Sequence, residues 1–136
     1  MAPQDDPEPL PRGLLWGVSW TFRGGPFAER AAFDAAVAEF QNPDRGEVWR
    51  PAEVCLRSAR VRVTPDVHWY LSDDDPIVEL TADDGVAFTA GELLFKVHNA
   101  LVADLRQMDH KYFEGFSLAR HQEPGLPPLY DLDLGS

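Results

Sequence analysis

The run from Thr89 to Met108 constrains the fold most, because its start, its period and its length all indicate one α-helix. Thr89 is followed three residues later by Glu92, the spacing of a capping box in which each side chain bonds the other residue's backbone N–H. At about 100° per residue, one face of the helix carries Leu93, Leu94, Phe95, Val97, Leu101, Val102, Leu105 and Met108. Such a wide apolar arc needs cover from several sides, so we predict that this helix lies across a β-sheet.

The segment before this helix predicts a strand, a turn and a second helix. From Leu14 to Phe22, large apolar side chains alternate with Gly, Ser and Thr, which is the period of a half-buried strand and places Trp16 and Trp20 on one buried face. A helix is predicted from Pro26 to Phe40, because proline suits the first helical position and apolar residues then recur at helical spacing. The turn before it lacks the spacing of a dinucleotide or phosphate loop, so we interpret it as a connection.

Short apolar and alternating runs predict the remaining strands. These cover residues 53–63, 67–71, 77–81, 112–120 and 129–134. The phase of the first run shifts near Ser58, which a β-bulge would explain, and Arg60 and Arg62 then mark a solvent-facing side. The order of elements predicts an α+β fold with a mostly antiparallel sheet and two helices packed on one face.

The 136 residues suit one domain, which we place at residues 13–136. Residues 1–12 hold four prolines among acids and are predicted to form a disordered arm that joins no core. Apolar runs are too short to cross a membrane, and the N-terminus lacks the basic start of a secretory signal. With a single cysteine, Cys55, no internal disulfide can form, and we expect a cytoplasmic protein. Arginine far outnumbers lysine and isoleucine occurs once, which indicates a GC-rich, bacterial genome.

The formal net charge is −11, and this charge limits the kinds of molecule that the protein is expected to bind. Phosphate binding needs clustered Lys and Arg, so the sequence argues against a nucleic acid as partner. It favours a basic protein, because complementary fields accelerate encounter. The alternative is that the acids serve only solubility.

The charge is also unevenly distributed along the chain. No Lys or Arg lies between Val63 and Phe95, a stretch that contains eight acids. We predict a partner-binding surface made of Asp66, Asp73, Asp74, Asp75, Glu79, Asp83 and Asp84, with Trp69 and Tyr70 as aromatic anchors. The alternative interpretation is that these acids are turn formers and helix caps.

No motif assigns a catalytic residue, a metal or a cofactor. His98 falls on the apolar arc of the central helix, where it is either a general base, with Asp104 or Glu114 as its acid, or a core histidine bonded to a backbone carbonyl. The four histidines lie on separate elements without ligand spacing, and the Asp73-Asp74-Asp75 loop lacks the pattern of a calcium hand.

These observations predict an acidic cytoplasmic protein-binding domain. Its most concrete version is an immunity or antitoxin protein that inhibits a basic bacterial toxin or nuclease, an analogy that rests on fold and charge alone. Two alternatives stay open. The first is a small enzyme that uses His98 with a nearby carboxylate. The second is a homo-oligomeric structural protein, of which a homodimer is the simplest form.

Overall fold

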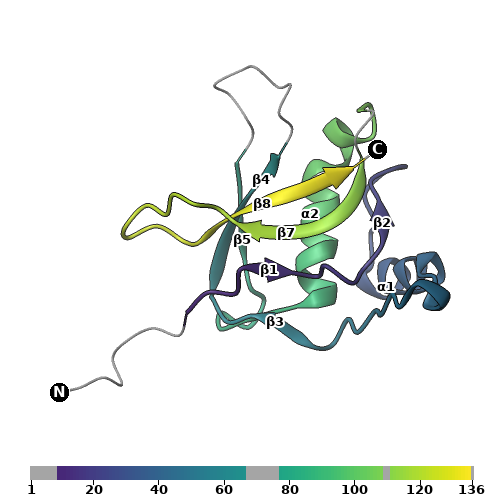
Figure 1. The fold of residues 1–136 in the computed structure, drawn as a ribbon, viewed down its shortest axis with the longest axis horizontal. Helices are drawn as coiled ribbons and strands as arrows, with labels where there is room; N and C mark the ends of the chain where they lie inside the picture. The colour runs from purple at the N-terminus through teal and green to yellow at the C-terminus, as the bar shows by residue number, and fades with distance from the viewer. Residues whose placement is uncertain (1–8, 67–76, 109–110, 136) are drawn as a thin grey trace.

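The computed structural model of the chain describes residues 9–66, 77–108 and 111–135. Within these residues the fold is α+β, with two α-helices and a mostly antiparallel sheet in a single compact domain, as predicted (Figure 1). Neither helix in the described part of the chain is long and apolar enough to cross a membrane.

The main sheet has six strands, and all but one of its pairings are antiparallel. In spatial order its path runs β1 (Gly13–Leu14), β7 (Tyr112–Leu118), β8 (Leu129–Gly135), β4 (Arg60–Asp66) and β5 (Val78–Thr81), and β2 (Trp20–Thr21) also pairs with β7. The parallel pair is β4 with β8. A separate two-stranded sheet joins β3 (Val54–Leu56) to β6 (Phe88–Thr89).

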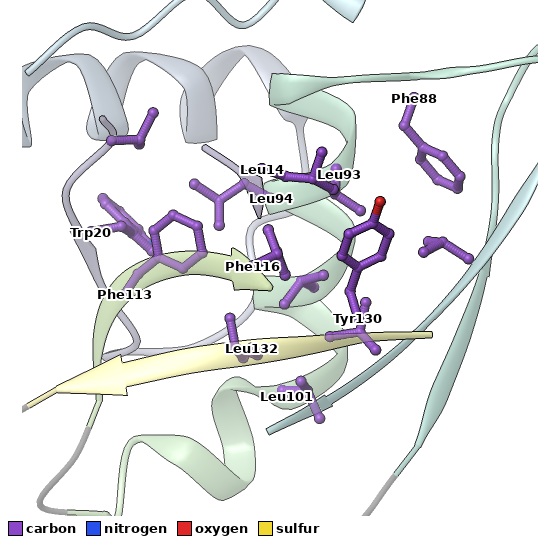
Figure 2. Close-up of a cluster of buried hydrophobic side chains, with 14 of the residues drawn as sticks. Leu14, Trp20, Phe88, Leu93, Leu94, Leu101, Phe113, Phe116, Tyr130 and Leu132 are labelled. Atoms are coloured by element: carbon purple, nitrogen blue, oxygen red, sulfur yellow. The ribbon is translucent and has the colours of Figure 1, made fainter. Parts of the chain in front are cut away.

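The predicted central helix is α2 (Ala90–Leu105), which lies behind β7 and β8 in Figure 1. Three of its buried leucines, Leu93, Leu94 and Leu101, lie among Phe113, Phe116, Tyr130 and Leu132 of the sheet strands (Figure 2). Thr89 caps the helix, since its Oγ1 accepts a hydrogen bond from the Glu92 backbone N–H at 3.2 Å. The reciprocal half of the capping box is wrong: the buried Glu92 carboxylate accepts instead from the backbone N–H of Asp83 at 2.6 Å.

The second helix, α1 (Arg30–Phe40), packs beside α2 and begins four residues later than predicted. The Asn99 side chain explains the delay. Its Oδ1 accepts from the Phe27 backbone N–H at 2.8 Å and its Nδ2 donates to the Phe27 carbonyl at 2.9 Å. Both backbone groups of Phe27 are thereby tied to α2, so helical bonding starts only after Glu29. A short 3₁₀ helix, η2 (Pro43–Arg45), follows.

The predicted strand over 14–22 is broken into β1 and β2. Leu15 adopts a left-handed conformation with φ 57°, and the Val18 N–H donates to its carbonyl at 3.2 Å, so the chain turns there. Trp20 and Phe22 are buried as predicted. The placement of Trp16 in the core is wrong, because the turn leaves its side chain exposed.

The predicted strand over 53–63 is also two strands, and they belong to different sheets. β3 pairs with β6, and β4 lies inside the main sheet. Arg60 is exposed as predicted, but Arg62 is only 7% exposed. Its Nε donates to the Pro127 carbonyl at 3.0 Å, because the proline-rich segment before β8 covers this side of the sheet.

The last residues of the predicted arm are attached to the domain. Leu10 packs against the core, the Tyr130 hydroxyl donates to the Pro11 carbonyl at 2.6 Å, and the Leu118 N–H donates to the Arg12 carbonyl at 2.9 Å. The rest of the arm, residues 1–8, and the predicted strand over 67–71 lie outside the described residues.

Candidate functional site

His98 is the catalytic candidate, and it lies fully buried on α2. Its Nδ1 is 3.1 Å from the indole Nε1 of Trp20, and its Nε2 is 3.0 Å from the Gly25 carbonyl oxygen. An indole N–H can only donate, so Nδ1 accepts and the ring proton is on Nε2. Phe22 stacks on the imidazole with ring centroids 5.8 Å apart. The ring is therefore neutral and bonded on both sides.

This environment suits a structural histidine. Burial lowers the pKa of His98 below its ordinary value, and the hydrogen bond to Gly25 opposes that shift only in part. Asp104 and Glu114, the predicted acids, are exposed on the surface, and both imidazole nitrogens have other partners. A general base needs a nitrogen within reach of a substrate proton. His98 instead ties β2 and the Gly24-Gly25 turn to α2.

Three acids of the predicted binding surface, Glu79, Asp83 and Asp84, have partners within the fold. Asp83 bonds Arg30 at 2.6 Å and Lys96 at 2.8 Å, and these hydrogen bonds, Lys96 first, lower the pKa of its carboxyl group. Lys96 also bonds the buried Glu92 at 2.9 Å. This cluster of charged side chains joins α1, the turn after β5 and α2. Asp83 therefore has a structural role in the fold.

Glu79 and Asp84 have local roles as well. Glu79 pairs with Arg60 across β4 and β5 at 3.2 Å. Asp84 Oδ1 accepts from the backbone N–H groups of Val86 at 2.8 Å and Ala87 at 3.0 Å, and these bonds lower the pKa of its carboxyl group. Glu79, Asp83 and Asp84 thus pair with basic side chains or form a turn.

The other predicted binding residues cluster in the β4–β5 connection. Asp66 ends β4, where its backbone is in register with Asp133 of β8. Asp73, Asp74, Asp75, Trp69 and Tyr70 lie outside the described residues.

A groove of about 500 Å³ is a feature that the sequence did not predict. The turn after β1 forms one side of it and residues 48–55 form the other. Three exposed apolar side chains, Trp16, Val48 and Val54, line it together, and Arg50 and Glu53, which lie 3.7 Å apart, balance each other's charge there. Exposed apolar groups that gather in one concave place are typical of binding surfaces.

Trp16 is held rigidly at this groove although most of it is exposed. Its Nε1 donates to the Phe116 carbonyl at 3.0 Å. The indole lies so close to Gly13 and Gly115 that a Cβ atom at either position would overlap the ring. Gly115 also has φ 112°, a conformation that favours glycine. The sequence signals for this arrangement were Gly13, beside the predicted strand over 14–22, and Gly115, inside the predicted strand over 112–120, since glycine in a strand pattern often marks close approach.

Nothing in the described residues resembles a metal centre or a reactive thiol. No group of three or more His, Cys, Asp or Glu side chains converges within these ranges. Burial raises the pKa of the Cys55 thiol to about 12, so it stays protonated at neutral pH. Comparison with known protein families, with characterised proteins and with solved structures finds no match to this chain.

Proposed function

We propose that the chain is an acidic cytoplasmic domain that binds a basic protein, most concretely an immunity or antitoxin protein that inhibits a basic bacterial toxin or nuclease. The observation that carries this proposal is the uneven charge. Three basic residues, Arg30, Arg60 and Lys96, pair with acids of the domain itself. The stretch between Val63 and Phe95 contains eight acids and no Lys or Arg, and such charge favours a partner of opposite sign.

The β4–β5 connection is the part of the predicted surface that we assign to the partner. Asp73, Asp74 and Asp75 are consecutive, and Trp69 and Tyr70 precede them by only a few residues. Acids steer the approach of a basic protein, and tryptophan and tyrosine are the residues most often found as interface anchors. Glu79, Asp83 and Asp84 contribute less, because they already have partners in the fold.

The two alternatives differ in their support. An enzyme that uses His98 would need the imidazole to be accessible, whereas both of its nitrogens are bonded inside the core. A homodimer has one observation in its favour, the exposed apolar side chains of Trp16, Val48 and Val54. Its test is the molar mass in solution as a function of protein concentration.

The test of the proposal is association with the product of the adjacent gene, if that protein is basic and co-purifies. Replacing Asp73, Asp74 and Asp75 together by Asn should slow association at low salt by about tenfold and flatten its salt dependence, because exposed charges act mainly by steering. Stopped-flow measurements at two ionic strengths give both quantities.

The matched control removes three charges elsewhere. Glu39, Asp104 and Glu114 are exposed on α1, α2 and β7, and replacing them by the corresponding amides changes the net charge equally. If this control slows association as much as the Asn triple variant, net charge alone steers the partner. If neither variant changes the rate or its salt dependence, the acidic surface is not the binding site.

A further inference from the structure

The groove beside Trp16 contains a free strand edge on β1. The Leu118 N–H donates to the Arg12 carbonyl, so these two residues form a hydrogen-bonded pair of the antiparallel ladder. Gly13 faces Ser117 at the next position. Since such pairs alternate, the N–H and C=O of Gly13 point away from β7. Gly13 itself lines the groove.

A second free edge comes from β3. The Ala90 N–H donates to the Glu53 carbonyl at 2.8 Å, and Val54 faces Thr89 at the next position. The Glu53 carbonyl and the Val54 N–H belong to one trans peptide and point in opposite directions, so the Val54 N–H points away from β6. The register of the pair shifts after Val54. Val54 lines the same groove as Gly13, and Figure 1 shows β1 and β3 as neighbouring strands at the lower margin of the molecule.

We propose that this groove binds an extended segment of another protein, which adds a strand between β1 and β3. Gly13 offers one backbone donor and one backbone acceptor, and Val54 offers one backbone donor. The main chain of an extended peptide carries both kinds of group at every second residue on each side. This complementarity specifies a polypeptide backbone. A compact small molecule or a lipid chain has no repeating donor and acceptor to match both edges.

The side chains of the groove define the sequence of the segment. Trp16, Val48 and Val54 offer apolar surface, so we expect a β-branched or aromatic residue at alternate positions. The opposite charges of Arg50 and Glu53 cancel locally, so we expect the residues of the bound segment to be uncharged. Because Trp16 is already fixed by Phe116 and two glycines, binding loses little side-chain entropy, as expected of an interface anchor.

This site is separate from the acidic connection proposed to steer a basic partner. Among the residues that the structure describes, none of those that line the groove belongs to the run from Asp66 to Asp84. The two proposals can therefore fail independently. The Asn triple variant should leave peptide binding in the groove unchanged, and groove variants should leave the salt dependence of association unchanged.

The probe is a displayed library of random twelve-residue peptides, selected on the full chain and counter-selected on Trp16→Ala. The best peptide is then synthesised and titrated by fluorescence anisotropy. Val54→Pro removes the N–H that faces the groove from β3. It should weaken binding by about tenfold or more, because the peptide carbonyl that accepted this hydrogen bond is left without a partner. Val54→Thr keeps the N–H and the side-chain shape, and should change the affinity by less than about threefold.

A second measurement does not depend on how the proline variant folds. Analogues of the peptide N-methylated at single residues are titrated against the unmodified chain. Methylation at positions that face Gly13 or Val54 should weaken binding by about tenfold or more, whereas methylation at the residues between them should not. Hydrogen exchange should show that the amides of Gly13 and Val54 become protected in the complex.

Several results would overturn the proposal. A library that yields no Trp16-dependent peptide would do so, as would a peptide whose binding ignores N-methylation and leaves both amides unprotected. Self-association that Trp16→Ala abolishes would identify a second copy as the occupant. Tighter peptide binding by about tenfold after deletion of residues 2–8 would identify the chain's own N-terminal segment instead.

Discussion

Trp16 and Trp20 lie four residues apart, yet the fold uses them in opposite ways. Trp20 is 6% exposed and donates its indole N–H to His98 in the core. Trp16 is 62% exposed and donates its indole N–H to the Phe116 carbonyl at the edge of a groove. The indole N–H of each tryptophan has a hydrogen-bond acceptor, but only Trp20 is buried.

The turn at Leu15 creates this difference. Alternation predicts a common face only while the backbone stays extended. The left-handed φ of Leu15 and the bond from Val18 to its carbonyl interrupt the strand, so Leu14 and Trp20 point inward while Trp16 points outward. An aromatic side chain that a rigid turn holds in solvent is free to bind a partner, whereas a buried one contributes to stability alone.

The largest expected effect is on the buried side of this pair. Trp20→Ala should lower the free energy of unfolding by about 3–5 kcal/mol, because it removes an aromatic side chain packed against Phe33 and Phe40 and leaves His98 Nδ1 without a donor. Urea unfolding followed by circular dichroism measures the loss. A loss below about 1 kcal/mol would mean that the interior of the domain is wrongly assigned.

The pH dependence of stability sharpens the description of the buried side. The pKa of folded His98 is below the value of 6.5 of the free side chain, because burial disfavours the charged ring. Below pH 6.5 the unfolded chain takes up a proton that the folded chain does not. The contribution of His98 is therefore fully present above pH 6.5 and is lost as the pH falls towards the folded pKa.

Urea unfolding at pH 7.5 and at pH 5.5 tests this sign, with His98→Gln as the control that cannot titrate in this range. The parent chain should lose more stability than His98→Gln over this interval. Equal losses would show that the acids, which also titrate in the fold, account for the pH dependence.

Local periodicity predicted the elements whose pattern is contained in one continuous run of residues. The run from Thr89 to Met108 appears as α2 with Thr89 as its cap, and the position of His98 on its apolar face is confirmed as buried. The α+β class is confirmed as well, because the order of elements needs no knowledge of long-range pairing.

Long-range contacts account for what the sequence did not predict. Arg62 looked solvent-facing because the cover over it comes from Pro127, 65 residues later. The Trp16 groove needs β1, β3 and the segment around Val48 to meet, and no local pattern encodes their proximity. Asp83, after β5, was visible in the sequence, but its partners Arg30 and Lys96 lie on other elements. Asp73, Asp74 and Asp75 lie outside the described residues, so their role stays a prediction.

The smallest expected effect is on the exposed side of the comparison. Trp16→Ala should lower the free energy of unfolding by about 1 kcal/mol or less, because the side chain is mostly solvated and loses one hydrogen bond and its contact with two glycines. Trp16→Phe keeps one aromatic ring and removes the second ring of the indole with the bond to Phe116, so its loss should be smaller than that of Trp16→Ala. Both variants are compared with Trp20→Ala in the same urea titration.

If Trp16→Ala were as destabilising as Trp20→Ala, the indole would be an integral part of the core and no longer a free surface. If Trp16→Ala costs little while it abolishes peptide binding, the turn at Leu15 serves to present this side chain to a partner.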